Sequence, residues 1–171
     1  MKKLFLMGRS EAGKTSLAQA LKGEELHYVK TQYTKTDEQV IDSPGEYSET
    51  KNCGHALACF SFEADVIGIL MAADEPYSLF NPACQSFTNR PLIGVITKIH
   101  EPYANVPMVR SWLEMAGCER IFEVDSATRE GIPELAAYLD EDIPRQSLRE
   151  AAAKQAAGIR EWEPWPENRK A

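Results

Sequence analysis

Short apolar runs alternate along the chain with longer segments of mixed polarity. Each run is close to strand length, is rich in Ile, Val, Leu or Phe, and shows little polar alternation, which is typical of a strand covered on both faces. The runs are Leu4–Met7, Val40–Ile41, Val66–Met71, Leu92–Ile96 and Ile121–Val124. The segments between them predict helices over about 14–21, 51–60, 106–116 and 132–139. Such alternation predicts an α/β fold, a doubly wound and mostly parallel sheet flanked by helices.

The last thirty-one residues differ from this pattern. Residues 145–160 contain the sequence EAAAK and predict a helix of good intrinsic propensity. Two prolines, at 164 and 166 within the sequence WEPWP, then end any helix. We therefore expect one domain over residues 1–140 and a C-terminal helical tail with a Pro-Trp end over 141–171.

Composition and charge narrow the class of protein. The 171 residues are 43% hydrophobic, and the net charge of −7 belongs entirely to residues 1–140. An acidic surface argues against nucleic-acid and anionic-lipid partners, and no apolar stretch approaches the ~20 residues of a membrane span. The four cysteines show no CxxC spacing, so free thiols are expected rather than disulfides or zinc. We expect a soluble, cytoplasmic protein.

The strongest chemical motif directly follows the first apolar run. Residues 8–15 have the sequence GRSEAGKT, which matches the phosphate-binding loop GxxxxGK[ST]. In such a loop successive backbone N–H groups surround a triphosphate, the lysine contacts the β- and γ-phosphates, and the threonine hydroxyl binds Mg²⁺. Lys14 is therefore the expected catalytic residue and Thr15 an expected metal ligand. The expected nucleotide-binding residues here are Gly8, Arg9, Ser10, Glu11, Ala12, Gly13, Lys14, Thr15 and Ser16.

A second motif, DSPG at residues 42–45, follows the second apolar run. Asp42 comes twenty-seven residues after Thr15, where a carboxylate at a strand end can hold Mg²⁺ through its water shell. The Gly45 amide would then contact the γ-phosphate. Glu46 is either a catalytic carboxylate that orients a nucleophile or a solvated loop charge, and the sequence favours neither.

The segment between these motifs, residues 27–38, carries three threonines. Any of Thr31, Thr34 and Thr36 could supply a further hydroxyl to Mg²⁺, as a segment that responds to the nucleotide does. The sequence does not choose among them.

Polar residues also follow the fourth and fifth apolar runs. The fourth run is followed by Thr97, Lys98 and His100, and the fifth by Ser126 and Ala127. These are the two places where small GTPases build a guanine pocket, from the elements [NT]KxD and SA. His100 replaces the expected Asp, and a neutral imidazole has one acceptor nitrogen where a carboxylate accepts both guanine N–H groups. Adenine therefore remains open as the bound base. The adjacent Glu101 could compensate if the loop were locally distorted.

With these motifs in order, the chain resembles the EutP/PduV family of ethanolamine and propanediol utilisation. The resemblance rests on KLFLMGRSEAGKTSLAQALKGEELHYVKTQY from residue 3, IDSPGEY from residue 41, and the stretches around residues 64–78, 89–94 and 112–122. It covers about residues 1–140 and leaves the tail aside. It implies a Ras-like P-loop fold that binds ATP or GTP with Mg²⁺. It also implies acetate kinase activity on ATP and acetate or acetyl phosphate, beside a bacterial microcompartment.

Two functions follow as alternatives. The first is a phosphoryl-transfer enzyme, either a slow hydrolase of nucleoside triphosphates or an acetate kinase. The second is a GTP-dependent switch or assembly factor that binds microcompartment shell or cargo proteins. The tail offers a docking peptide for such proteins, because Leu148, Ala152, Ile159 and Trp162 fall loosely on one helical face. A helix that packs back on its own domain explains the same thin apolar stripe.

Overall fold

The computed structural model describes residues 1–24, 26, 35–36, 40–43, 59 and 62–141. The chain divides into two units, residues 1–141 and 142–171, and every described residue belongs to the first. The helix expected over 51–60 lies outside the described residues apart from Cys59. The tail expected over 141–171 lies outside them after Glu141.

A six-stranded sheet forms the centre of the described unit, in the order β2-β3-β1-β4-β5-β6. Five neighbouring strands run parallel, and only the pair β2–β3 is antiparallel. The predicted doubly wound, mostly parallel sheet is confirmed, with the short edge strand β2 as an addition. The strands are β1 (Leu4–Gly8), β2 (Lys35–Thr36), β3 (Val40–Asp42), β4 (Val66–Ala72), β5 (Leu92–Thr97) and β6 (Arg120–Glu123).

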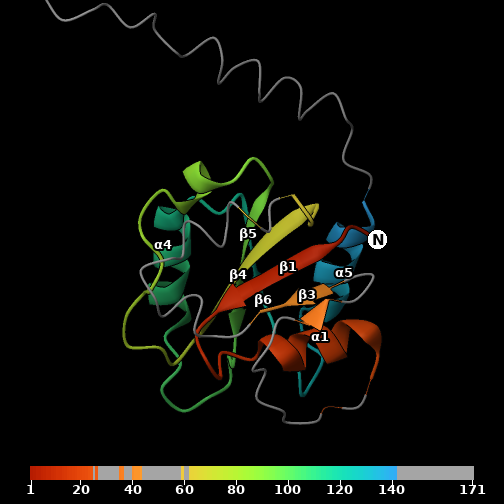
Figure 1. The fold of residues 1–171 in the computed structure, drawn as a ribbon. Helices are drawn as coiled ribbons and strands as arrows, with labels where there is room; N and C mark the ends of the chain where they lie inside the picture. Colours follow the sequence, from red (N-terminus) through yellow and green to blue (C-terminus); the bar gives the residue numbers. More distant parts are fainter. Residues whose placement is uncertain (25, 27–34, 37–39, 44–58, 60–61, 142–171) are drawn as a thin grey trace, which may run out of the picture. The chain divides into compact units, whose positions relative to one another are not determined.

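Helices cover both faces of this sheet (Figure 1). They are α1 (Lys14–Lys22), the short 3-10 helix η1 (Cys84–Phe87), α4 (Val106–Ala116) and α5 (Ile132–Asp140). α4 lies on one face of the sheet, and α1 and α5 lie together on the other. Local residues fix the helix ends. The Asn105 side chain accepts a hydrogen bond from the Met108 N–H at the start of α4, and Gly23 ends α1 in the left-handed conformation.

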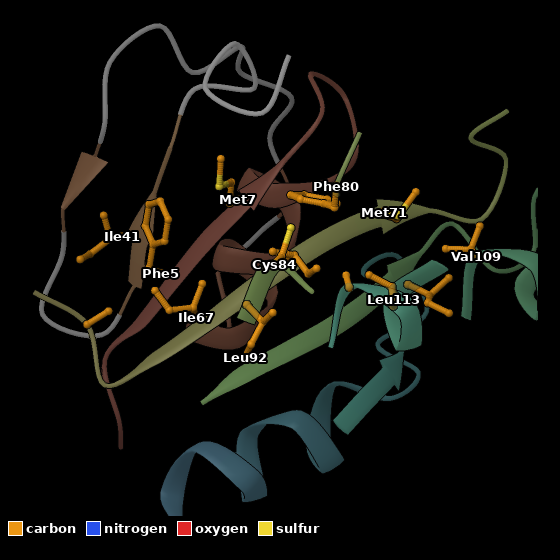
Figure 2. Close-up of a cluster of buried hydrophobic side chains, with 14 of the residues drawn as sticks. Phe5, Met7, Ile41, Ile67, Met71, Phe80, Cys84, Leu92, Val109 and Leu113 are labelled. Carbon is orange, nitrogen blue, oxygen red and sulfur yellow. The ribbon is translucent and has the colours of Figure 1, made fainter. Parts of the chain in front are cut away.

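The strands place alternate side chains in two separate cores. One core lies on the face covered by α4 and is drawn in Figure 2. Its members include Phe5, Met7, Ile67 and Met71 from the strands and Val109 and Leu113 from α4. The neighbouring positions, Leu4 and Leu6 among them, pack against α1 and α5. Because both faces are buried, the strands appear in the sequence as continuous apolar runs instead of alternating ones.

Parallel strands bring their carboxyl ends to one edge of the sheet, which is where open α/β folds bind ligands. The segments that follow β1, β3, β4, β5 and β6 all begin at this edge. Within the part of the chain that the structure describes, no helix is both long enough and apolar enough to cross a bilayer.

Candidate functional site

The loop Arg9–Gly13 joins β1 to α1 and turns tightly at both ends. A Cβ atom on Gly8 would lie 2.6 Å from the Leu70 carbonyl oxygen, so only glycine lets β1 end this close to β4. Gly13, with φ 94°, turns the chain into the first turn of α1. Within the loop the Ala12 N–H donates to the Arg9 carbonyl at 3.2 Å. The sequence motif is therefore built as a closed strand–loop–helix turn.

Lys14 lies across this loop. Its side chain is buried, with 6% of the residue exposed, and Nζ donates to the carbonyl oxygens of Gly8 and Arg9 at 2.7 Å each. The two carbonyls hold the ammonium group at the mouth of the loop, beside the positive end of the α1 dipole. An anion at this place meets a fixed cation and a helix N-terminus together.

Thr15 and Asp42 meet between α1 and β3. The Thr15 hydroxyl donates to Asp42 Oδ2 at 2.8 Å, and Asp42, the last residue of β3, is 5% exposed with its other oxygen Oδ1 buried as well. Hydroxyl and carboxylate oxygens are the donors that Mg²⁺ takes from protein. Among the described residues no group of three His, Cys, Asp or Glu side chains could hold a metal ion. Thr15 and Asp42 thus form a donor pair of the chemical kind that Mg²⁺ binds.

Ser43 fixes the position of this pair, and sequence reasoning missed it. Its hydroxyl donates to the Leu6 carbonyl at 2.8 Å, and the residue is fully buried. The bond ties the end of β3 to β1 and so holds Asp42 against the phosphate-binding loop. The expected γ-phosphate contact Gly45, the expected catalytic Glu46, and the threonines Thr31 and Thr34 lie outside the described residues. Thr36 is described only as part of the β2 backbone.

Thr97 connects the end of β5 to the phosphate-binding loop. Its hydroxyl donates to the Ala12 carbonyl at 2.6 Å, with 3% of the residue exposed, and its side chain lies against Gly13. Lys98 follows in the left-handed conformation, with φ 55°, and leads the chain away from the strand. The structure therefore gives Thr97 a contact with the loop itself, which sequence reasoning did not foresee.

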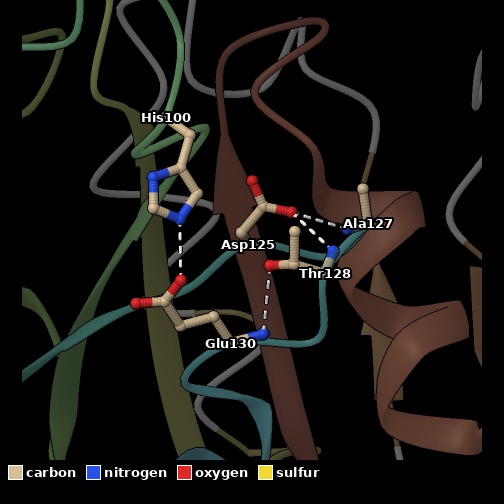
Figure 3. Close-up of polar contacts among 5 residues, drawn as sticks. All are labelled: His100, Asp125, Ala127, Thr128 and Glu130. Carbon is tan, nitrogen blue, oxygen red and sulfur yellow. Dashed lines mark hydrogen bonds and ion pairs between the residues drawn. The ribbon is translucent and has the colours of Figure 1, made fainter.

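The segment after β6 forms a tight turn that Asp125 organises (Figure 3). Asp125 Oδ1 accepts the N–H groups of Ala127 at 2.8 Å and Thr128 at 2.9 Å, and the Asp125 N–H donates to the Glu130 carbonyl. The amide of Ala127, one of the residues expected at the base pocket, is thus held by a carboxylate of its own turn. An Asp two residues before the amide is the local pattern of an Asx turn, so the sequence did carry this signal.

His100 pairs with Glu130 across the two loops. His100 Nε2 and Glu130 Oε2 lie 2.7 Å apart, and the two side chains are each 57% exposed. The hydrogen bond to Glu130 raises the pKa of His100 above its ordinary value, and the charge of Asp125 adds to this. Glu130, thirty residues away in the sequence, therefore supplies a carboxylate beside His100.

The remaining loop residues face different surroundings. The Arg9 guanidinium donates to the Tyr77 hydroxyl at 2.8 Å and lies 4.8 Å from the ring centroid, so this side chain is held on the segment after β4. Glu75, on the same segment, is buried, and its Oε1 accepts the Ala72 N–H. Burial raises the pKa of Glu75, and the nearby Arg9 charge opposes that rise.

The remaining residues that the sequence analysis assigned to nucleotide binding differ from one another in solvent exposure. Glu11 is exposed and has φ 64°, whereas Ser10 and Ser16 are half-buried. Ser126 is half-buried beside the exposed Ala127. The structure brings two groups of expected residues to one edge of the sheet. They are the residues of the phosphate-binding loop and those of the loops after β5 and β6.

Comparison with known families identifies the chain. The sequence model of the PduV-EutP family, described as "Ethanolamine utilisation - propanediol utilisation", matches residues 1–141. The chain belongs to the PduV-EutP family. The family match ends at the residue where the first unit of the chain ends. The resemblance given by the sequence motifs is confirmed.

Curated members of the PduV-EutP family align over most of their length. The chain is 39% identical over 142 residues to "Propanediol utilization protein PduV" of Citrobacter freundii, covering 82% of this chain and 94% of that protein. It is 32% identical over 142 residues to "Probable acetate kinase EutP" of Escherichia coli and of Salmonella typhimurium, covering 81% of this chain and 89% of each relative.

A solved structure supports the fold assignment for this family member. The chain is similar to Methanosarcina barkeri Roco2 RocCORdC bound to GDP, with a TM-score of 0.53 and 18% sequence identity over 86% of this chain. The chain spans about half of that protein's length, 49%. This likeness shows the expected Ras-like P-loop fold.

Proposed function

We propose that this PduV-EutP family member is an Mg²⁺-dependent nucleoside triphosphate-binding protein that catalyses phosphoryl transfer in ethanolamine or propanediol utilisation. The observation that carries the proposal is the pairing of Lys14 with the Thr15–Asp42 contact at the N-terminus of α1. The buried ammonium of Lys14 and the Thr15 hydroxyl, which donates to Asp42 at 2.8 Å, both come from the start of α1, directly after the loop. Together they match the charge and donor needs of a magnesium–triphosphate group.

The residues of this loop would act by positioning and charge neutralisation. Lys14 would exchange its two carbonyl partners for oxygens of the β- and γ-phosphates, a short movement of one side chain. The N–H groups of the loop and the first turn of α1 would complete the anion site. Because Lys14 is already buried, little rotamer freedom remains to be lost on binding.

Thr15 and Asp42 are the residues that would hold Mg²⁺. The Thr15 hydroxyl would bind the ion directly, and Asp42 would bind through the ion's water shell. When bound, the ion neutralises charge on the β- and γ-phosphates. The bond from Ser43 to β1 supports this role, because it would hold Asp42 in place before the nucleotide arrives.

The names of the relatives support acetate as the acceptor, because two of them are called probable acetate kinases. In that reaction a carboxylate oxygen of acetate attacks the γ-phosphorus of ATP, the bond to the β,γ-bridging oxygen breaks, and acetyl phosphate and ADP form. The attacking acetate carries no proton, so this transfer needs no general base. Hydrolysis uses water instead, and the proposed role of Glu46 is to orient that water.

A GTP-dependent switch or assembly factor is the second candidate. The shared fold with Roco2 bound to GDP favours it, since this fold can couple the γ-phosphate to the loops around it. In this role the segments 27–38 and 44–50 would bind microcompartment shell or cargo proteins. In either role we propose that the protein works in the cytoplasm beside a microcompartment.

Calorimetry with Mg–ATP and Mg–GTP, combined with turnover in the presence and absence of acetate, tests both candidates. Lys14→Ala should weaken triphosphate binding by about 10- to 100-fold, because charged hydrogen bonds are lost. Thr15→Val should abolish the gain in affinity that Mg²⁺ provides while leaving metal-free binding near its original value. Lys22→Ala, at the other end of α1, is the matched control.

Each outcome has a distinct meaning. Tight triphosphate binding by Lys14→Ala would overturn the assignment of the loop. Acetate-dependent release of ADP supports the kinase. Turnover that ignores acetate, together with partner binding that depends on the bound nucleotide, would replace the kinase by the switch.

A further inference from the structure

Arg9 contributes a half-buried guanidinium group to the phosphate-binding loop. One of its nitrogens donates to the Tyr77 hydroxyl at 2.8 Å, and the guanidinium carbon lies 4.8 Å from the centroid of the Tyr77 ring. A guanidinium group has five N–H donors. Among the described residues, the Tyr77 hydroxyl is the only hydrogen-bond acceptor that the Arg9 side chain has. Tyr77 therefore fixes the guanidinium in place and leaves most of its N–H groups for a ligand.

Glu75 lies on the same segment as Tyr77 and does not form an ion pair with Arg9. Its Oε1 accepts the Ala72 N–H at 2.9 Å, and its charge acts on Arg9 only over a longer distance. Within the part of the chain that the structure describes, no carboxylate forms an ion pair with the Arg9 guanidinium. An anionic ligand would therefore reach this cation without displacing a carboxylate of the protein.

The backbone of Arg9 lies beside the lysine that is proposed to contact the γ-phosphate. Its carbonyl oxygen accepts a hydrogen bond from Lys14 Nζ at 2.7 Å. If the proposed nucleotide function holds, on which this inference rests, Lys14 exchanges this carbonyl for a phosphate oxygen. The γ-phosphate then lies beside residue 9, and the side chain of that residue can hold a second anion next to it.

The Arg9 side chain extends on the side of the sheet opposite α1. Side chains alternate along β1, with Leu6 in the core under α1 and Met7 in the core under α4, so residue 9 falls on the side of Met7. Tyr77 agrees with this placement, because its segment continues to Phe80 in the α4 core. In phosphoryl transfer the attacking and leaving oxygens lie roughly in line across the phosphorus. Since the loop and α1 hold the phosphates on one side, the acceptor has to approach from the other side, where Arg9 lies.

We propose that Arg9 binds the carboxylate of the phosphoryl acceptor and that Tyr77 is the positioning residue that holds the guanidinium for it. A guanidinium and a carboxylate can form two parallel hydrogen bonds, and the positive charge offsets the repulsion between the acceptor and the triphosphate. In the transfer, one acetate oxygen forms a bond to the γ-phosphorus, the bond to the β,γ-bridging oxygen breaks, and ADP leaves with that electron pair. Arg9 stays hydrogen-bonded to the other acetate oxygen. The acceptor class is a small carboxylate such as acetate.

Steady-state kinetics of the full chain with Mg–ATP and acetate, combined with calorimetry of Mg–ATP binding, tests this assignment. Arg9→Gln should raise the KM for acetate by about 10- to 100-fold, because charged hydrogen bonds are lost. The dissociation constant of Mg–ATP should change by about threefold at most, since salt screens the remaining effect of the charge. Arg9→Lys, which keeps the charge without the paired donors, should give an intermediate KM for acetate.

Two further variants separate the role of Tyr77 from a general effect of lost charge. Tyr77→Phe keeps the ring and loses the hydroxyl, so the KM for acetate should rise about 3- to 10-fold while the affinity for Mg–ATP stays unchanged. Arg110→Gln is the matched control, because it removes a guanidinium that pairs with Glu123 on β6. It should change neither quantity.

The outcomes distinguish this inference from the proposed function. An unchanged KM for acetate in Arg9→Gln, or a loss confined to Mg–ATP affinity, would overturn the role of Arg9. A wild type that binds Mg–ATP but releases no more ADP when acetate is added would overturn it as well. Failure of the wild type to bind Mg–ATP would instead overturn the proposed function.

Discussion

Glu11 stands in the phosphate-binding loop with a backbone conformation that glycine adopts most easily. Its φ of 64° lies in the left-handed region. That region costs an L-residue with a side chain about 1–2 kcal/mol. The Glu11 carboxylate is also a negative charge in a loop proposed to hold a triphosphate. We therefore expect Glu11 to lower both folding stability and nucleotide affinity.

Two substitutions at Glu11 separate these costs. Glu11→Gln keeps the strain and removes the charge, so ATP should bind about 3- to 10-fold more tightly at low salt, with the gain shrinking in high salt. Glu11→Gly also relieves the strain, so its melting temperature should equal or exceed that of Glu11→Gln. Calorimetry at two salt concentrations and thermal unfolding measure both effects. Weaker ATP binding by Glu11→Gln would show that the carboxylate assists the ligand.

At the residue scale, the sequence predicts best where the chemistry is local. The spacing of Gly8, Gly13, Lys14 and Thr15 is a property of one short loop, and the structure builds that loop as the motif requires. The partner of His100 depends instead on how two loops bend. Glu130 lies thirty residues further along the chain, and only the fold brings it to His100. No sequence pattern encodes that encounter.

At the element scale, the parallel strands were predictable because burial on both faces leaves long apolar runs. β2 was not, since Lys35–Thr36 has two polar residues and owes its place to pairing with β3. The helices α1, α4 and α5 match the predicted ranges to within a few residues. The ends of α1 are marked in the sequence by Gly13 and Gly23, and those of α4 by Asn105 and Gly117. Strand order follows from the pairing of distant segments, which local pattern does not specify.

Thr97 couples β5 to the phosphate-binding loop through one buried hydrogen bond, and this coupling can be tested. Thr97→Val keeps the shape but leaves the Ala12 carbonyl without this donor, which should cost about 1–3 kcal/mol of the free energy of unfolding. The melting temperature should fall by about 3–8 °C, and ATP should bind less tightly because the loop is less fixed. Thermal unfolding and calorimetry measure the two changes.

Thr97→Ser is the control for this prediction, because it retains the hydroxyl and loses only a methyl group. It should keep most of the nucleotide affinity. If Thr97→Ser loses affinity and Thr97→Val does not, the methyl group matters and the hydrogen bond does not.

At the scale of the whole molecule, the nucleotide-binding unit and the family coincide. The family match covers residues 1–141, and the curated relatives align over 142 residues, most of their own length. Residues 142–171 lie outside the family match, and we propose that they serve as a docking peptide for microcompartment shell or cargo proteins.

Deletion of residues 145–171 tests whether the first unit binds nucleotide by itself and whether the tail is needed for partner binding. The nucleotide affinity of the shortened chain should stay within about twofold of the wild type, because separate sites act independently and Lys14, Thr15 and Asp42 all lie in the first unit. Co-purification with shell or cargo proteins should be lost. A full-length control with Trp162→Ala and Trp165→Ala keeps the length and charge of the tail. It should lose the same partners, since the two indole rings are the largest apolar groups of the tail.

The two readouts of this deletion can fail separately. Unchanged co-purification would contradict the docking role and leave the nucleotide site untouched. A fall in nucleotide affinity of more than about tenfold, which is about 1.4 kcal/mol, would mean that the tail contributes to the site, and the domain boundary near residue 140 would be wrong. Residues 145–171 carry six basic and four acidic side chains, so their removal changes the net charge by only two. Long-range electrostatics, which salt screens further, is therefore too weak to account for a loss of that size.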